Sequence, residues 1–409
     1  MEYPLHRFRN NHKAIGLGDP AWDKAREHHL TDLSIRAAGN DRLALKDGFE
    51  FINLSSCSYL GLHGHPAILD GAIEALRNER VLDVPTSRIR IRLTLLDELE
   101  AEMEKLWRVR CICGATAGAI TSGVLPLLAS GHLGDGKPPV MVFDKYCHFS
   151  MNLIKPICGD ETEVLTSPHN DLDFIEDACK KYPRVAYVAD GVYSLGGAAP
   201  VRELMELQDR YGLFLYFDDS HSLSIFGENG EGYVRSLMPG ELNPRTVIVV
   251  SLCKGFGGSG GVIMLGSRRH EDMVIRWGGP LGWSQKLSTA AMGADLASVR
   301  LHQTPELREL QQKMLRNLAC FDSLIPTENS GDPFTIRLVH VGDEERVSEI
   351  SGEIFRRGFY TSPVFFPIVE RGRAGLRVMI RADNNPEDVL RFCDAVEELV
   401  GLPRAAAVV

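Results

Sequence analysis

Short apolar runs alternate with stretches of helical length between about residue 51 and residue 265, and this alternation constrains the fold more than any other feature. The apolar runs carry few polar residues, so we expect strands that are buried on both faces. Buried strands separated by amphipathic helices indicate a mostly parallel sheet covered by helices. The expected strands are 109–113, 140–143, 184–189, 213–217, 246–252 and 262–265, and the expected helices are 66–80, 95–106, 117–130, 171–181 and 201–211.

The segments on either side of this region have a different pattern of polar and apolar residues. Residues 1–50 are mostly polar and end in a hairpin signal at Asp47-Gly48, which predicts an N-terminal arm followed by a hairpin. Residues 291–409 begin with a long helical region and continue with strands and two further helices, which predicts a small α+β domain. We therefore expect three parts: an arm and hairpin (1–50), a large sheet domain (51–290) and a small C-terminal domain (291–409).

Composition narrows the class of protein. Apolar residues make up 44% and charged residues 24% of the chain, which is the balance of a globular protein in water. The net charge of −10 gives no general attraction to nucleic acid or anionic lipid. The N-terminus lacks the apolar core of a signal peptide, and no apolar run is long enough to span a membrane. We expect a cytoplasmic protein with no nucleic-acid partner.

The nine cysteines are scattered and odd in number, which favours reduced thiols over a disulfide framework. Cys111 and Cys113 are two residues apart in an apolar run, so on a strand they face the same side. No second cysteine pair lies nearby to complete a metal site, and we interpret both as core residues.

Lys254 follows an apolar strand and precedes a glycine-rich run that extends to Gly261. A lysine in this position can be partly desolvated, which favours its neutral, nucleophilic amine. One alternative is a phosphate-binding loop, but in that motif the lysine follows the glycines. The other alternative is a surface lysine at a turn.

Asp218 stands at the end of another apolar strand, and His221 follows three residues later. A buried aspartate is costly unless it meets a cation, and a protonated ring nitrogen of a cofactor is such a cation. His221 could then hydrogen-bond an oxygen on the same ring. Asp and His are also metal ligands, but no further His or Glu cluster accompanies them, and we expect no metal.

A turn of small residues, Gly114-Ala115-Thr116, joins an apolar strand to a helix. The unpaired amides and the dipole of a helix N-terminus favour phosphate there. The segment 121–123, Thr-Ser-Gly, is a competing candidate. His148 and Ser194 follow two further strands of the same sheet.

An amine, a carboxylate with a histidine, and a phosphate-ready turn match the aldehyde, ring nitrogen and phosphate of pyridoxal 5′-phosphate (PLP). With these residues the chain resembles the α-oxoamine synthases, which belong to the fold type I, aspartate aminotransferase-like PLP enzymes. The resemblance spans about residues 51–400. It rests on four segments: 53–62, which contains Tyr-Leu-Gly-Leu; 190–197, Asp-Gly-Val-Tyr-Ser-Leu-Gly-Gly; 218–221, Asp-Asp-Ser-His; and 251–257, Ser-Leu-Cys-Lys-Gly-Phe-Gly.

The resemblance implies a role for each of these residues. Lys254 would form the imine with PLP, and Asp218 would hold the proton on the ring nitrogen. His221 and Ser194 would contact the ring oxygen, and His148 would stack on the ring face. The implied catalytic residues are Lys254, His148, Asp218 and His221. The implied cofactor ligands are Gly114, Ala115, Thr116, His148, Ser194, Asp218, His221, Ser251, Lys254 and Ser284, the last reaching the phosphate of a neighbouring subunit.

The resemblance also implies where substrate binds. Arg377 occupies the family's carboxylate-binding position, and an arginine can grip a carboxylate with two hydrogen bonds. Arg381 is a competitor for this role. Cys57 stands where the family usually has asparagine, Leu96 lies near a family histidine, and Ser222 replaces a glycine. These departures bear on the choice of amino donor, so the resemblance does not carry the family's usual small donor over to this chain.

Arg88, Arg90 and Arg92 alternate along the chain, so an extended segment would present all three on one side. They would then clamp an acidic substrate or the phosphates of coenzyme A. A solvated basic edge is the alternative interpretation.

The implied activity is that of a PLP-dependent C-acyltransferase. It would condense an amino acid with an acyl thioester, delivered by coenzyme A or an acyl carrier protein, to give an α-aminoketone. The alternative is another PLP-dependent reaction: transamination, aldol cleavage or side-chain replacement. A non-catalytic homologue is a third hypothesis, against which the presence of Lys254 argues. The family analogy further implies a homodimer with the active site between subunits.

Overall fold

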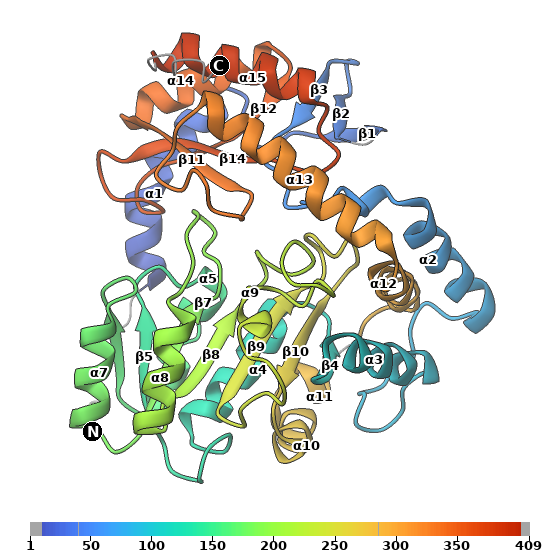
Figure 1. Ribbon diagram of the computed structural model, residues 1–409, viewed down its shortest axis with the longest axis vertical. Coiled ribbons are helices and arrows are strands. Elements are labelled where there is room, and N and C mark those ends of the chain that lie inside the picture. The colour runs from blue at the N-terminus through green and yellow to red at the C-terminus, as the bar shows by residue number, and fades with distance from the viewer. Residues whose placement is uncertain (1–9, 40, 285, 402–409) are drawn as a thin grey trace. The chain divides into compact units, whose positions relative to one another are not determined.

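The computed structural model of the protein describes residues 10–39, 41–284 and 286–401 (Figure 1). They form two compact units. The first comprises Leu62–Ser194 and Ala198–Arg308, and the second comprises residues 10–61, the short segment Leu195–Gly197 and residues 309–401. Residues 10–50 thus share a unit with the C-terminal segment rather than forming a separate arm, and the boundaries at 50 and 290 stay predictions.

The first unit contains a seven-stranded sheet of order β4-β10-β9-β8-β7-β5-β6. Its strands are β4 (Arg110–Gly114), β5 (Val140–Asp144), β6 (Val164–Ser167), β7 (Val185–Asp190), β8 (Phe214–Asp218), β9 (Thr246–Ser251) and β10 (Gly261–Leu265). The pairs from β9 to β6 are parallel, whereas β10 runs antiparallel to both β4 and β9. The mostly parallel α/β sheet is therefore confirmed.

Helices cover both faces of this sheet (Figure 1). Successive residues of a strand point to opposite faces of the sheet, and in β8 both faces are apolar. Leu215 and Phe217 belong to one apolar cluster, and Phe214 and Tyr216 belong to another. The helices of this unit are η1 (Leu62–Gly64), α2 (Pro66–Glu79), α3 (Thr94–Trp107), α4 (Ala117–Ala129), α5 (Phe149–Asn152), α6 (Lys155–Glu161), α7 (Leu172–Lys181), α8 (Val201–Tyr211), α9 (Tyr233–Ser236), α10 (Arg268–Trp277), α11 (Pro280–Trp283) and α12 (Thr289–His302).

The second unit joins the two ends of the chain. A parallel pair between β3 and β12 connects the hairpin near Asp47 to the C-terminal segment. One sheet has four strands in the order β1 (Ile35–Gly39), β2 (Arg42–Leu45), β3 (Glu50–Asn53) and β12 (Phe359–Tyr360). The other has three strands in the order β11 (Ile336–Gly342), β14 (Ala374–Met379) and β13 (Ser362–Val364). Its helices are α1 (Asn10–Glu27), α14 (Glu344–Arg356) and α15 (Pro386–Val400), with most of α13 (Pro305–Leu324). No helix in the described ranges is long and apolar enough to cross a membrane.

Candidate functional site

The register of the sheet brings several predicted site residues to one edge. Asp190 at the end of β7 lies opposite Asp218 at the end of β8. On the other side, Gly261 at the start of β10 pairs with both Ser251 and Gly114. Because β4, β7, β8 and β9 all end at this edge, Asp218, Ser251 and the 114–116 turn share it, as expected for a ligand site in an open α/β sheet.

Lys254 lies in the tight connection between β9 and β10. Its Nζ is 3.0 Å from Nε2 of His221, so the amine and the imidazole form one hydrogen-bonded pair. The connection is closed by backbone bonds from Leu252 N to Gly260 O (3.0 Å) and from Gly258 N to Leu252 O (2.9 Å). The half-buried Lys254 is therefore presented from a fixed backbone.

A buried carboxylate on α12 holds this loop from behind. Oδ1 of Asp295 accepts from Ser259 N at 2.9 Å, and burial raises the pKa of Asp295 well above its usual range. A Cβ at Gly258 would lie 1.9 Å from the same oxygen, so the close approach requires glycine. No sequence pattern indicates this contact, because an aspartate in a helix ordinarily faces solvent.

Two carboxylates stand side by side at the strand ends. Asp218 is 5% exposed, and its Oδ1 accepts from Ser220 N at 3.1 Å. Asp190 accepts from the backbone N–H of His148 at 2.7 Å. Burial, and then the neighbouring charge of Asp218, raise the pKa of Asp190 well above its usual range. The raised pKa favours the protonated form of Asp190 beside Asp218.

His148 begins α5 as its N-terminal cap and is exposed. Its Nδ1 lies 2.9 Å from Oγ of Ser150, and its backbone is anchored by Asp190. The loop that carries it also depends on Asp144, which accepts from Tyr146 N at 2.8 Å and from Tyr187 Oη at 3.0 Å. Asp144 and Asp190 were not among the predicted site residues, although each is a carboxylate at the end of an apolar strand, the same signal that identified Asp218.

Asp219, one residue after Asp218, faces a different part of the fold. It is fully buried, and its Oδ2 accepts from Val234 N at 2.8 Å. Burial raises the pKa of Asp219 to about 7. A Cβ at Gly191 would lie 2.4 Å from its Oδ1. Asp219 therefore fixes the turn between Asp218 and His221.

The 114–116 turn leads directly into α4. Thr116 caps this helix by accepting from Ala119 N at 2.9 Å, and Ala115 and Thr116 are exposed. The start of β10 is held against the turn, because a Cβ at Gly261 would lie 2.5 Å from Ala117 N. The first amides of a helix have no partner within it, so this end of α4 is suited to an anion. The competing Thr121 lies inside α4, where its Oγ1 accepts from the buried Tyr216.

The three arginines do not share a face, contrary to prediction. The chain turns between Ser87 and Arg90, where Arg90 N donates to Ser87 O at 3.0 Å, so the segment is not extended. Arg88 is buried and donates to both carboxylate oxygens of Glu100 at 2.8 Å. Arg90 lies over the Trp283 ring, and Arg92 pairs with Asp97. A substrate-binding role for each of them stays a prediction.

The remaining predicted substrate residues lie in the second unit. Sγ of Cys57 is 3.6 Å from Sδ of Met379, two residues after Arg377 on β14. Nε of Arg377 is buried and has no hydrogen-bond partner among the described residues. Arg381 instead uses its guanidinium on Asp383, with contacts of 2.8 and 2.7 Å. Arg377 is therefore better suited than Arg381 to receive a carboxylate.

Two predicted residues sit at the ends of elements. Ser194 is half-buried in the turn that follows β7, and Ser284 is exposed directly after α11. Among the described residues, no group of three or more His, Cys, Asp or Glu side chains is arranged to hold a metal ion.

The chain is similar to known enzymes over nearly its full length. An 8-amino-7-oxononanoate synthase from Alkaliphilus metalliredigens is 27% identical, over 90% of this chain and 92% of the relative, and one from Thermoanaerobacter pseudethanolicus is 28% identical, over 86% and 88%. Among solved structures, a serine palmitoyltransferase from Sphingomonas wittichii matches with a TM-score of 0.80 at 18% identity, over 94% of this chain and 98% of that chain. An 8-amino-7-oxononanoate synthase from Francisella tularensis matches with a TM-score of 0.69 at 17% identity, over 86% and 98%.

These structural likenesses show a shared fold, and the sheet described above is that of the fold type I enzymes. The family model described as aminotransferase class I and II matches residues 50–396. The chain therefore belongs to the aminotransferase class I and II family.

Proposed function

We propose that the protein is a PLP-dependent C-acyltransferase that condenses an amino acid with an acyl thioester. The observation that carries the proposal is the 3.0 Å pair of Lys254 and His221 at the sheet edge that also holds Asp218, Ser251 and the start of α4. The relatives named 8-amino-7-oxononanoate synthase, which align over most of the chain, support this class of reaction.

The described residues fit PLP at each of its functional groups. Asp218 offers a buried carboxylate to the ring nitrogen, Lys254 an amine to the aldehyde, and the first turn of α4 with Ser251 a set of donors to the phosphate. His221, Ser194 and the exposed His148 would complete the ring contacts. When bound, PLP supplies an electron sink for the charge that develops at the α-carbon of the amino acid.

The chain's own residues would manage protons and orientation. Asp218 would keep a proton on the ring nitrogen, because its carboxylate is buried at the end of β8, where a cation can balance its charge. Lys254, once its amine is free, is the general acid and base at the α-carbon. His221 can exchange a proton with Lys254 directly, because their nitrogens are within hydrogen-bond distance.

The second unit would bind the substrate carboxylate. Arg377 has an unpartnered buried nitrogen, and Cys57 lies beside the strand that carries it. In the overall reaction a carbon–carbon bond forms between the α-carbon and the acyl carbonyl, and the thiol and CO2 leave. The products are an α-aminoketone, a free thiol and CO2.

Transamination is the second candidate, favoured by the description of the matching family as aminotransferase. It needs no thioester and releases no thiol.

The test is a product assay with and without thioester. The PLP-loaded protein is incubated with each amino acid and with acyl-coenzyme A, and products are identified by mass spectrometry. Thiol release that requires both substrates, is abolished in Lys254→Ala and is kept in the control Lys313→Ala supports the proposal. Turnover of an amino acid to its α-keto acid in the unmodified protein, when an α-keto acid replaces the thioester as co-substrate and accepts the amino group, overturns it in favour of transamination.

The proposed state is a cytoplasmic homodimer. Large apolar side chains are exposed on α2, on the segment that follows it and at the end of α11, and backbone N of Thr289 donates to Leu82 O, which holds that segment against α12. The exposed side chains are Leu69, Ile73, Val81, Leu82, Ile91 and Trp283. All nine cysteines lie in the described residues and are free, which supports a reducing compartment. Sedimentation of Leu82→Glu tests the dimer, since a monomer is expected if this surface is the interface.

A further inference from the structure

A cavity of about 340 Å³ opens at the edge of the large sheet opposite the candidate site. It is lined by residues at the amino ends of four strands, among them Pro139 before β5, Arg184 before β7 and Arg245 before β9. Asp190, at the other end of β7, is six residues further along the strand than Arg184, which corresponds to about 20 Å. The cavity is therefore separate from the site that carries Lys254.

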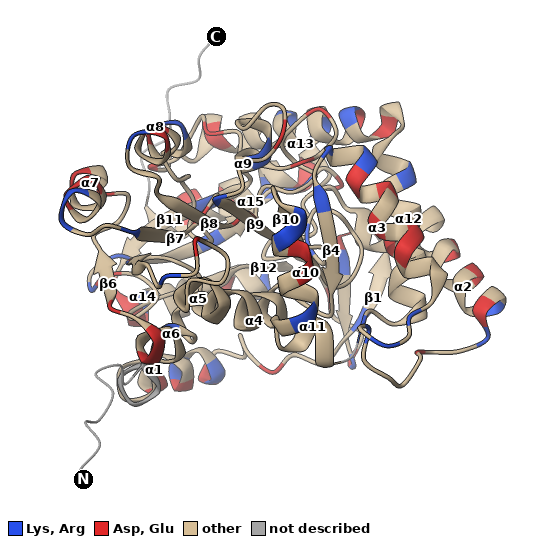
Figure 2. Ribbon diagram, turned by 90° about the horizontal axis from the view of Figure 1, so that it is seen from below, with Lys and Arg blue, Asp and Glu red and all other residues tan. Residues whose placement is uncertain are grey.

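The cavity gathers positive charge on a chain whose net charge is −10. Elsewhere Lys and Arg are interspersed with Asp and Glu, as on helices α2 and α7 (Figure 2). The cavity instead carries Lys137, Arg184 and Arg245 against a single carboxylate, Asp135. The surplus of two positive charges matches the charge of a phosphate monoester near pH 7.

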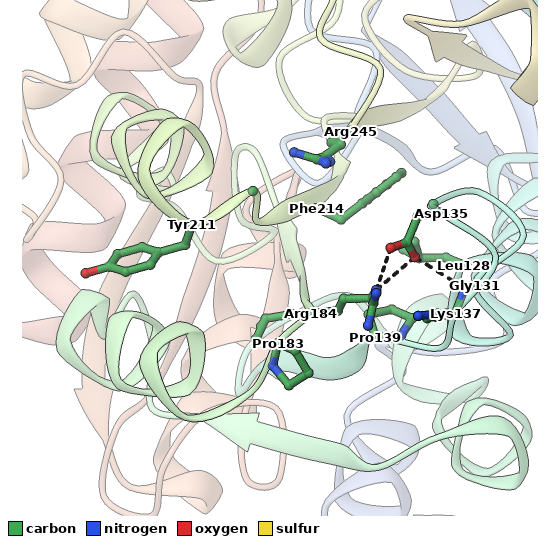
Figure 3. A pocket seen from close by; sticks show the side chains of 13 residues that line it. Leu128, Gly131, Asp135, Lys137, Pro139, Pro183, Arg184, Tyr211, Phe214 and Arg245 are labelled. Carbon is green, nitrogen blue, oxygen red and sulfur yellow. Dashed lines mark hydrogen bonds and ion pairs between the residues drawn. The ribbon is translucent and has the colours of Figure 1, made fainter.

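Most hydrogen-bond donors of these three side chains have no protein partner among the described residues. Arg184 uses only Nε, which donates to both oxygens of Asp135 at 2.8 and 2.7 Å. Within the described ranges, the side chains of Arg245 and Lys137 make no hydrogen bond or ion pair. Figure 3 draws Arg245 and Arg184 with the ring of Phe214 between them. The guanidinium groups thus border an apolar surface and keep donors for a ligand.

The backbone that presents Arg245 is fixed. Its carbonyl oxygen accepts from Leu215 N at 2.8 Å and from Nε2 of Gln208 at 3.1 Å. Gly212, at the end of α8 with a φ of 70°, leaves space for the side chain, because a Cβ there would lie 2.9 Å from Nη1 of Arg245. The backbone of Arg245 is therefore already ordered before a ligand binds, so that binding has to order only the side chain.

We propose that this cavity binds a small organic phosphate. The phosphate would lie between Arg184, Arg245 and Lys137, where guanidinium groups offer paired donors to its oxygens. Its apolar body would rest on Phe214 and the neighbouring Leu128 and Val185. This binding site is independent of the proposed acyltransferase reaction, since it shares no residue with it.

The proposal is tested by titration calorimetry of the PLP-loaded protein, so that the cofactor's own phosphate site is filled. The probes are phenyl phosphate, inorganic phosphate and benzoate. We expect saturable binding of one phenyl phosphate per chain, with weaker binding of both other probes. Arg245→Glu should weaken phenyl phosphate at least tenfold, and Arg245→Gln should weaken it less.

Arg202→Glu is the matched control, because Arg202 is an exposed arginine on α8 nine residues before Tyr211, about 14 Å away along the helix. It changes the net charge as Arg245→Glu does. Undiminished binding in both Arg245 variants, equal weakening in the control, or the absence of saturable binding overturns the proposal. Inorganic phosphate or benzoate binding as tightly as phenyl phosphate overturns the assignment of an organic phosphate.

Discussion

Replacing Arg88 by methionine separates a structural from a substrate-binding role for this arginine. Arg88 is 3% exposed and donates two 2.8 Å bonds to Glu100 and a 3.1 Å bond to Cys113 O. Burial raises the pKa of Glu100, which shows how poorly that carboxylate is solvated. In Arg88→Met the carboxylate of Glu100 would keep the 2.7 Å bond from Cys113 N but lose its counter-charge.

Removing one partner of a buried ion pair typically costs about 3 to 5 kcal/mol. We expect the free energy of unfolding of Arg88→Met to fall by about that amount, measured by urea denaturation at saturating PLP. Glu100→Gln in the same chain should recover part of the loss, because it removes the stranded charge. Arg92→Met is the control: its exposed pair with Asp97 should contribute about 1 kcal/mol or less.

Unfolding of Arg88→Met at the same urea concentration as the unmodified protein would contradict a structural role for the pair of Arg88 and Glu100. A raised KM for the thioester with unchanged stability would then restore the predicted substrate-binding role. Failure of Glu100→Gln to recover any stability would show that packing, rather than the unpaired charge, accounts for the loss.

Burial raises the pKa of Asp219 from 3.8 to about 7, so the folded state binds the proton of this carboxyl more tightly than the unfolded chain does. The stability that proton binding contributes is present below about pH 4 and is lost as the pH rises to 7. Relative to Asp219→Asn, the free energy of unfolding of the unmodified protein should therefore fall by about 4 kcal/mol over that range, and a constant difference would contradict this. Gly258→Ala should lower the free energy of unfolding by about 1 to 3 kcal/mol, because its Cβ would lie 1.9 Å from the Asp295 carboxylate. An unchanged midpoint in urea denaturation would contradict this and would show that the loop shifts to make room. Arg381→Leu should lower the free energy of unfolding by about 3 kcal/mol, because it removes one partner of the buried pair with Asp383. Arg377→Leu should instead mainly raise KM for the amino acid. The reverse pattern in denaturation and steady-state kinetics would exchange the roles of the two arginines.

The strands of the large sheet were predictable because a strand buried on both faces is a short apolar run with clear ends. The exception is β6, Val164–Ser167, which contains two polar residues and lies at the sheet edge. The pairing of Phe359 with Ile52 was not predictable, because contacts between residues so far apart leave no local pattern. For that reason the N-terminal hairpin was expected to stand apart from the C-terminal segment.

The candidate site likewise contains residues that the sequence could predict and contacts that it could not. Asp218 and Lys254 were predicted as site residues because a charged residue at or shortly after the end of an apolar strand is unusual, and their roles stay predictions. The shared face predicted for Arg88, Arg90 and Arg92 assumed an extended segment, whereas the chain turns at Ser87 and Arg88 pairs with Glu100. A buried carboxylate such as Asp295 looks in the sequence like any exposed helical aspartate, so its contact with Ser259 could only come from the fold.

The single reversed strand, β10, decides whether the site can form. Because β10 is antiparallel to both β4 and β9, those two strands run in the same direction and end at the same edge. The start of α4 and the loop of Lys254 are thus two strand spacings apart, about 10 Å. With only the short segment 252–260 between β9 and β10, a helical crossover is excluded and the reversed direction is required. A parallel β10 would need a longer connection and would carry Gly261 to the opposite edge, away from Gly114 and Ser251.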